Sequence, residues 1–600
     1  MLNLIQHKPA VDDKIHMRYI FFVIVAVLFA FAPIAGAHAA TEGERTQSAT
    51  LSTLVETIPA DIPREERTGR ERGSLSVFGF RMQGASGYNG ELPFWIHSNR
   101  FGELDPGSTT ATLHLFGAWR RDYRSGISLS TGAGMLMRDT GVLSVQFQEA
   151  YLQAGYGHFV LWAGRKREYL GMVHPQLSMG TMDLSHNARP IPKITLASDG
   201  FRPFPGTRGI LDYDVSISHG WMRDNEYRSV QRPLLHQKHL YIRLFNERSR
   251  VVPHAGVQHF AQWGGESPLT GAVPVGPRAF RDVFFSRSSN AKELFEGGLL
   301  GNQYQNHVGT YDFSLLFRFD RYRVSVSRQF ILEDTPNARF GTPWDGMWGA
   351  WIEFHPDRRS GREEARPGRR NDRNSSQRPD HHPSHRPDHN SSHRPDRNSS
   401  QRTSDSDNAR SSQQISGRSA ASRPFFVLRA INYEHMNTIA GVDRYPHRDR
   451  SNYFNYYNHS AYRGGWTYNG RSLGNPLFLS DNYHIGVVNN LILAHHVGVM
   501  GYAGPADWRL FTTYSRNYGA SGITGRDGRG YSGVTGRRDQ WSFMLELGGP
   551  DLLAGLVDLL APGMTVVLHE LELTATFGLD IGQAQRKNAG VMVGLRWATR

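Results

Sequence analysis

The sequence predicts an all-β protein: a large, closed, antiparallel transmembrane β-barrel of the outer-membrane type, with about 16 to 18 strands and short helical segments as plugs. Three observations predict this fold. Apolar and polar side chains alternate in many short segments, most clearly in residues 311–328. These segments recur between turn residues at fairly even spacing, which favours a sheet that closes on itself. The chain also contains 63 Gly, 24 Tyr, 32 Phe and 12 Trp, a profile typical of strands, turns and interfacial aromatic girdles.

Residues 311–328 read as two strands that meet at a polar point, residues 320–321. In the first strand, aromatic and aliphatic side chains occupy every second position, at Tyr311, Phe313, Leu315, Phe317 and Phe319. Strand side chains point to opposite faces in turn, so one face is apolar and the other is charged or hydroxylated. A soluble sandwich would turn the apolar face to its core, whereas a membrane barrel turns it to lipid.

The composition is compatible with a barrel and with few other membrane folds. Hydrophobic residues make up 39% of the 600 residues, and the mean hydropathy is −0.49. Such a chain is too polar for helical membrane spans, but half of each barrel strand faces water. The chain has no Cys, which excludes disulfides and thiolate metal sites. The formal charge of +13 favours acidic partners and does not by itself indicate nucleic acid.

The N-terminal residues 1–39 predict a signal peptide. Lys14 and Arg18 precede an apolar run, residues 19–35, and Ala37-His38-Ala39 forms a small-x-small cleavage pattern. Met17 is an alternative start, because it would give a more ordinary n-region. A retained membrane helix is the alternative to removal. Export of this aromatic, cysteine-free chain predicts the outer membrane of a diderm bacterium, with residues 40–73 as a polar periplasmic lead-in.

Residues 74–355 and 425–600 are predicted to form the two parts of the barrel. The alternation returns around Leu113, Leu115 and Trp119, around Ile127 and Leu129, at 541–547 and at 571–580. The last strand, residues 591–597, has one apolar face and ends in Trp597. It resembles the signal read by barrel-assembly machinery, although Ala598-Thr599-Arg600 follows the aromatic residue.

Two segments interrupt the strand pattern. Residues 356–424 are of low complexity, with about 15 Arg against about 9 acidic residues, and almost no apolar side chain. Burial cannot offset the entropy of ordering such a segment, so we expect a disordered basic loop. Its five His are irregularly spaced, and a solvated loop is favoured over a metal site. Residues 551–560 have helical spacing between Pro550 and Pro562 and predict a short helix that caps or plugs one barrel end.

Catalytic motifs are absent from the sequence. It contains no Walker A loop, nucleophile elbow or H-E-x-x-H motif. His495 and His496 are neighbours on a predicted strand, so they point to opposite faces and cannot share one metal ion. We therefore expect no enzyme, no bound metal and no cofactor. A glycan-modifying enzyme would rely on Glu149 and Glu434 as its carboxylates, but their spacing does not support this.

An ordered set of Asn-, Arg- and aromatic-rich stretches distinguishes the chain. The set includes EAYL at 149–152, AGRKR at 163–167, LSMG at 177–180, SHNARPIPK at 185–193, HAG at 254–256, HFAQWGG at 259–265, EHMNT at 434–438, NYFN at 452–455, GWTYNGR at 465–471, GNP at 474–476, VNN at 488–490, AHH at 494–496 and SRNYG at 515–519. In this order the stretches resemble the Wzi-type capsule-assembly family of outer-membrane proteins, from about residue 92 to residue 518. The resemblance implies a barrel that holds surface polysaccharide in a lectin-like manner, without turnover, after export machinery delivers it. The basic insertion departs from the family; it could lie outside and attract an acidic glycan, or simply be tolerated.

The residue types suit sugar binding independently of the resemblance. Arg165, Arg189, Lys193 and Arg471 could pair with acidic sugar groups. Four asparagines could bind hydroxyls, and two aromatic rings could stack on sugar faces. These candidates are Asn187, Asn455, Asn489, Asn490, Trp466 and Tyr468. The competing interpretation is structural: turn-forming Asn, girdle aromatics, and lumen charges that stiffen the barrel.

The sequence thus predicts an outer-membrane barrel that binds or anchors capsular or other surface polysaccharide. Its expected partners are that polysaccharide, particularly an acidic one, outer-membrane lipid, barrel-assembly machinery and polysaccharide export proteins. The alternative function is a porin or specific channel for small solutes or glycans.

Overall fold

The structure is a computed structural model that describes most of residues 74–599. The described residues are 74–88, 90–245, 249–268, 271–286, 305–333, 340–355, 426–440, 455–459, 461–481, 486–504, 506–524, 530–549, 552, 571–585 and 587–599. They all belong to one unit, residues 1–355 with 426–600. The predicted signal peptide, lead-in and insertion lie outside the described residues, as does the predicted helix 551–560 apart from Leu552.

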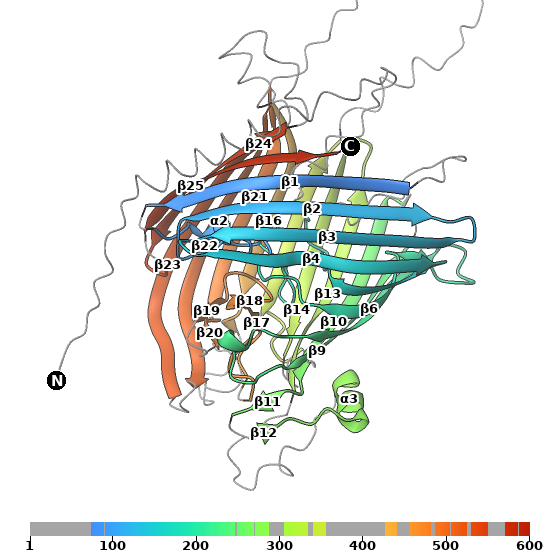
Figure 1. The fold of residues 1–600 in the computed structure, drawn as a ribbon, viewed down its shortest axis with the longest axis horizontal. Coiled ribbons are helices and arrows are strands. Elements are labelled where there is room, and N and C mark those ends of the chain that lie inside the picture. Colours follow the sequence, from blue (N-terminus) through green and yellow to red (C-terminus); the bar gives the residue numbers. More distant parts are fainter. Residues whose placement is uncertain are drawn as a thin grey trace, which may run out of the picture. The chain divides into compact units, whose positions relative to one another are not determined.

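Eighteen strands form one closed antiparallel barrel, which confirms the predicted fold class. In order around the wall they are β1 (Ser74–Gly87), β2 (Thr110–Asp122), β3 (Ile127–Asp139), β4 (Leu143–Tyr156), β5 (Phe159–Arg165), β6 (Lys193–Ser198), β8 (Leu211–Trp221), β9 (Leu234–Leu244), β10 (Val251–Trp263), β13 (Asn306–Arg318), β14 (Tyr322–Leu332), β15 (Gly346–Phe354), β16 (Phe426–Asn437), β21 (Ile492–Ala503), β22 (Ala506–Thr524), β23 (Gly530–Gly549), β24 (Leu571–Gly582) and β25 (Asn588–Ala598). The barrel closes where β1 pairs with β25, from Gly79 opposite Ala598 to Gly87 opposite Gly590. Figure 1 shows these first and last strands side by side, in blue and red.

The other elements are short. They are α2 (Phe94–His97), β7 (Arg202–Pro203), the 3-10 turn η2 (Asn225–Tyr227), β11 (Glu266–Ser267), β12 (Gly271–Ala272), α3 (Pro277–Phe284), β17 (Thr467–Tyr468), β18 (Arg471–Ser472), β19 (Leu479–Asp481) and β20 (Gly486–Asn489). None of the helices in the described ranges is long and apolar enough to cross a membrane.

The hairpin β13–β14 shows why the sheet closes with its apolar face outward. Phe313 and Leu315 are 43% and 44% exposed, whereas Asp312 and Ser314 between them are 0% and 7% exposed. The apolar side chains therefore face out of the barrel and the polar ones face the lumen, as the alternation predicts. Closure pairs every edge strand of the sheet. This matters because lipid cannot form hydrogen bonds with the backbone N–H and C=O groups of an open edge.

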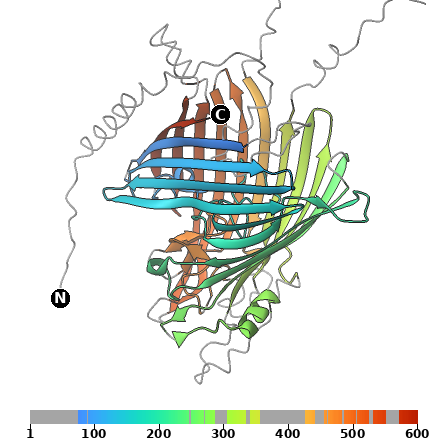
Figure 2. The same cartoon turned by 45° about the vertical axis from the view of Figure 1, so that its right-hand side comes forward.

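The two ends of the barrel differ in the length of their connections. At the end where β1 begins and β25 stops, here called the terminus end, several strands are joined by only two to six residues, as at 123–126, 157–158, 245–250, 319–321 and 504–505. Much longer segments join the strands at the other end, here called the long-connection end: 88–109, 166–192, 264–305 and 438–491. The barrel residues that flank the basic insertion, His355 and Phe426, are at the terminus end, because β15 finishes there and β16 begins there. Figure 2 shows the same wall from a second direction.

Candidate functional site

The lumen of the barrel is filled by connections from the long-connection end. We call the described parts of 88–109, 166–192, 222–233 and 438–491 the plug. Plug side chains form one hydrophobic cluster with inward-facing side chains of the wall, each at most 6% exposed. Its largest plug members are Phe94, Trp95, Tyr456, Tyr457, Trp466, Tyr468 and Phe478, and its wall members include Phe260, Met347, Phe511 and Met544. The lumen therefore holds a packed core, unlike a water-filled pore.

The plug is hydrogen-bonded to strands on different parts of the wall. Trp95 donates from Nε1 to Oγ1 of Thr513 on β22, at 3.0 Å. The backbone N–H of Phe94 donates to Asp580 on β24, at 2.8 Å. Near the middle of the plug, the carbonyl of Leu177 is 2.9 Å from Nε2 of His496 on β21. His496 thus faces inward, opposite to His495, as predicted from their adjacency.

Buried ion pairs also hold the plug to the wall. Glu103 of the plug bonds to Arg81 on β1 and to Arg167, and all three side chains are at most 9% exposed. Arg167 in turn lies 3.3 Å from Glu149 on β4, measured from Nε to Oε2. The four groups alternate in sign, which is how buried charges are made tolerable.

The two carboxylates considered for catalysis both hold the same connection, residues 166–192. Glu149 accepts a hydrogen bond from the backbone N–H of Arg167, at 3.1 Å. Glu434 accepts one from the backbone N–H of Met179, at 2.7 Å. Both carboxylates therefore have a structural role in positioning the plug.

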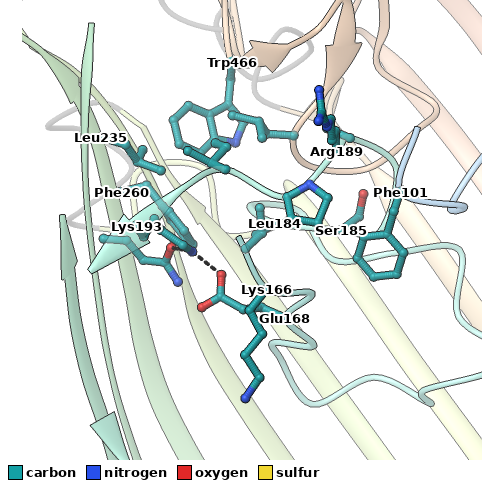
Figure 3. A pocket seen from close by; sticks show the side chains of 15 residues that line it. Phe101, Lys166, Glu168, Leu184, Ser185, Arg189, Lys193, Leu235, Phe260 and Trp466 are labelled. Atoms are coloured by element: carbon teal, nitrogen blue, oxygen red, sulfur yellow. Dashed lines mark hydrogen bonds and ion pairs between the residues drawn. The ribbon is translucent and has the colours of Figure 1, made fainter. Parts of the chain in front are cut away.

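Three of the ten candidate binding residues, Arg189, Lys193 and Trp466, line one cavity between plug and wall (Figure 3). We call it the basic cavity. Its other polar lining residues are Lys166, Glu168, Ser185 and Gln237, and its apolar lining includes Phe101, Leu184, Leu235, Phe260 and Leu473. The centre of a water molecule fits within only about 20 Å³ of it. That space suits about one water molecule and is too small for a sugar ring.

Lys193 of the basic cavity makes an ion pair, a hydrogen bond and a contact with an aromatic ring. Its ammonium group pairs with Glu168, as the dashed line in Figure 3 marks, and donates to Oε1 of Gln237 at 2.6 Å. It also lies 5.8 Å from the centre of the Trp162 ring. Lys193 itself is only 3% exposed, so its charge is neutralised inside the barrel.

The cations of this region outnumber the carboxylates. Lys166, Arg189 and Lys193 line the cavity with Glu168 as the one acidic lining residue. Arg165, at the end of β5, donates to the carbonyl of Pro190 at 3.1 Å. Burial and, next, the charge of Arg165 lower the pKa of Arg189 to about 10, which still leaves it charged at neutral pH. Arg165, Lys166 and Arg189 are partly exposed, so the excess positive charge faces water.

The four candidate asparagines serve as hydrogen-bonding links within the plug or between plug and wall. Asn490 donates from Nδ2 to Asn455 Oδ1 at 2.9 Å and to the Tyr456 carbonyl at 2.8 Å. Asn489 donates to Oδ1 of Asn517 on β22 at 2.8 Å. Asn187 donates to the carbonyl of Ser472 at 3.1 Å and so joins two plug connections.

The two candidate aromatic platforms are inside the plug. Trp466 is fully buried, donates from Nε1 to the carbonyl of Asp183 at 2.6 Å, and packs edge-on to Phe260 at 5.5 Å. Tyr468 is 2% exposed and pairs with Arg471 across the β17–β18 hairpin. Both rings are thus covered by neighbouring side chains in this structure. Stacking of these rings on a sugar, and sugar binding by the asparagines, stay predictions.

Arg471 is also a link within the plug. Its guanidinium donates to the carbonyl of His97 at 3.2 Å and to that of Leu104. Burial lowers the pKa of Arg471 to about 10, with Asp105 acting in the opposite direction. Arg471 does not line the basic cavity, whose lining includes Arg189, Lys193 and Trp466 among the candidates, and Arg165 bonds to Pro190 of the lining.

Several residues that line the cavity are not among the residues predicted to bind sugar. Lys166 and Glu168 follow Arg165 directly, so the charged stretch that singled out Arg165 could have indicated them. Gln237 and Phe101 come from distant segments, and no local pattern identifies them. Within the described parts of the chain, no group of three or more His, Asp or Glu side chains is arranged to hold a metal ion.

Comparisons with known proteins return solved structures only. No family model and no curated protein matches the sequence. One similar solved structure is Wzi of Escherichia coli, described as a carbohydrate-binding β-barrel and an outer-membrane protein involved in group 1 capsule assembly. Its sequence is 13% identical, and the match has a TM-score of 0.46 and covers 86% of this chain and 83% of that one. OccK5 (OpdH) of Pseudomonas aeruginosa is 6% identical, with a TM-score of 0.39 over 88% and 97% of the two chains. OpdK from the same species is 8% identical, with a TM-score of 0.38 over 88% and 99%. Identities this low assign no function, and the architecture rests on the strand pairing itself: the protein is a plugged, eighteen-stranded β-barrel of the outer-membrane type.

Proposed function

We propose that the protein holds an acidic surface polysaccharide at the cell exterior without chemical turnover. The packed plug is the observation that carries this proposal. A channel needs a continuous water-filled path, whereas the described lumen contains a hydrophobic core and buried ion pairs. A plugged barrel suits an anchor better than a porin.

The lengths of the connections support an orientation for this anchor. Outer-membrane barrels have short periplasmic turns and longer external loops. The terminus end would then face the periplasm and the plug would enter from outside. His355 and Phe426 would also lie on the periplasmic side.

The charge of the basic cavity supports an acidic ligand. Arg165, Lys166 and Arg189 are partly exposed, and carboxylates of uronic or pyruvylated sugars would pair with them, most effectively with the planar guanidinium groups. The cavity itself admits only water, so the polysaccharide would meet these cations at the surface of the plug. The resemblance to the Wzi-type family implies the same role, with export machinery delivering the glycan.

Two measurements test the proposal. Deleting the gene should shift surface polysaccharide from the cell-bound fraction to the medium, and the intact gene should restore retention. Purified protein in planar bilayers should pass little current, because the plug closes the lumen. Unchanged retention after deletion would refute the anchor role, and steady porin-like conductance would favour the channel.

A further inference from the structure

The outer wall of β22 and β23 changes abruptly from apolar to charged. On β23 the outward positions are Leu547, Leu545, Phe543 and Trp541 from the terminus end upward, followed by Asp539 and Arg537. Leu545 and Trp541 are 37% and 43% exposed, as expected for lipid-facing side chains. On β22 the same change occurs between Tyr514 and Arg516, and Arg516 pairs directly with Asp539. The change from apolar to charged side chains therefore occurs at the same level of the wall on both strands.

A row of rings marks this boundary on four neighbouring strands. His435, His495, Tyr514 and Trp541 are direct cross-strand partners on β16, β21, β22 and β23. The two imidazole rings stack with centres 4.6 Å apart, and the Tyr514 and Trp541 rings lie 4.9 Å apart. Such aromatic rows lie where the hydrocarbon of a bilayer meets its headgroups.

Two arginines converge just beyond the row. Arg516 donates from Nε to the hydroxyl of Tyr514 at 3.0 Å, and Arg537 approaches the same hydroxyl at 3.5 Å. Arg537 also donates from Nε to Asp539 at 2.8 Å. The side chains of Arg537 and Asp539 are 49% and 38% exposed. Asp539 forms its ion pair with Arg537 and lies opposite Arg516 in the strand register. Two guanidinium groups thus lie beside one carboxylate, which leaves net positive charge at the headgroup level.

We propose that this rim patch, formed by Tyr514, Arg516, Arg537 and Trp541, binds the phosphorylated headgroup of a glycolipid in the outer leaflet. The patch faces out of the barrel at the long-connection end, so a membrane lipid reaches it directly. The assignment to the outer leaflet rests on the orientation proposed above, in which this end faces the cell exterior. Arg537 holds Asp539 through Nε and Nη2, at 2.8 and 2.5 Å. The guanidinium N–H groups that do not bond to Asp539 or Tyr514 would donate to phosphate oxygens. The rings of Tyr514 and Trp541 lie below them, where the acyl chains of the same lipid begin.

Native mass spectrometry of the purified full-length protein tests this site. The probe is lipid A carrying its phosphates, with fully dephosphorylated lipid A as the matched ligand. We expect R516Q/R537Q to retain about tenfold less phosphorylated lipid than wild type, since each surface arginine contributes appreciably to binding anionic lipid. R120Q/R121Q removes the same charge at the end of β2, at the terminus end, and should retain lipid as wild type does.

A conservative variant separates binding from folding. R516K/R537K keeps both charges and should retain most of the lipid, and heat-dependent gel mobility shows whether each variant is folded. Equal retention of lipid by wild type and folded R516Q/R537Q would overturn the proposal. The proposal would also be overturned if wild type retained dephosphorylated lipid A as well as it retains phosphorylated lipid A. Loss of acidic polysaccharide binding in R516Q/R537Q, with lipid retention unchanged, would likewise overturn it and assign the patch to the glycan.

Discussion

The guanidinium of Arg100 donates a hydrogen bond of 3.0 Å to Glu546, which joins the plug connection after β1 to β23 of the wall. Glu546 also accepts a hydrogen bond of 2.7 Å from Arg509 on β22. The side chains of Arg100 and Glu546 are each 6% exposed, so water could solvate neither charge well if the pair were broken. The plug is therefore fixed by charge as well as by apolar packing.

Removing this carboxylate should destabilise the barrel. Glu546→Ala removes the carboxylate that bonds to Arg100 and Arg509, whose side chains are 6% and 13% exposed. Removing one partner of a buried pair costs about 3–5 kcal/mol. The measurement is the temperature at which the folded form is lost on unboiled gels. Glu572→Ala is the control, because its pair with Arg596 is 20–25% exposed and should contribute about 1 kcal/mol or less. Similar midpoints for the two variants would contradict the role given to Glu546.

Shortening the plug should open the barrel. Replacing residues 461–481 by a short Gly-Ser linker removes Trp466, Tyr468 and Leu473 from the core of the lumen. We expect the wall to persist, since its strand pairing does not involve these residues, and single-channel conductance to rise well above that of wild type. A folded variant that conducts no better than wild type would show that other segments suffice to close the lumen.

Stability should depend on pH through Asp183 of the plug. Burial and the neighbouring Asp312 carboxylate raise the pKa of Asp183 to about 7, partly offset by the hydroxyl of Thr310. A carboxyl with a raised folded-state pKa holds its proton more tightly when folded. Its contribution to stability is fully present below about pH 4, the unfolded pKa, and is lost as the pH rises to about 7.

Asp183→Asn should therefore flatten this pH dependence. The denaturant concentration at the unfolding midpoint of wild type should decrease as the pH is raised from 4 to 7. The midpoint of the variant should change less over the same range. Asp320→Asn, at the exposed turn between β13 and β14, is the control and should keep the wild-type slope. An unchanged slope in Asp183→Asn would assign the pH dependence to other groups.

A side chain at Gly256 should disturb the wall. A Cβ there would lie 2.0 Å from the Tyr241 ring, whose hydroxyl donates to Asp312 at 2.5 Å. Gly256→Val should destabilise the barrel by about 1–3 kcal/mol, as overpacking does. Gly117→Val is the matched change, because the nearest atom to a Cβ there would be 3.6 Å away. Folded yield after refolding into detergent should decrease for Gly256→Val and stay at the wild-type level for Gly117→Val.

Neutralising the exposed cations near the basic cavity should weaken binding of an acidic polysaccharide. R165Q/R189Q removes two partly exposed guanidinium groups, and we expect an affinity loss of about tenfold for an acidic glycan. A neutral glycan of similar length should bind both proteins alike. Retention of wild-type affinity for the acidic glycan would show that it binds elsewhere.

The sequence by itself determined the class of the fold and the faces of its strands. Alternation has a period of two residues and is a local property, so Phe313 and Asp312 could be assigned to opposite faces before any contact was known. The same reasoning separated His495 from His496. Turn chemistry placed the break at residues 320–321, between the observed ends of β13 and β14.

Only the tertiary structure decided which two strands close the barrel, the exact count of eighteen strands and what surrounds each candidate binding residue. Closure joins β1 to β25, at opposite ends of the chain, and no local pattern reports such a pair. Trp466 and Asn490 have the residue types of a sugar site, yet they are fully buried in the plug. Residue type states what a side chain can bind, but what covers it depends on segments hundreds of positions away, such as Phe260 against Trp466.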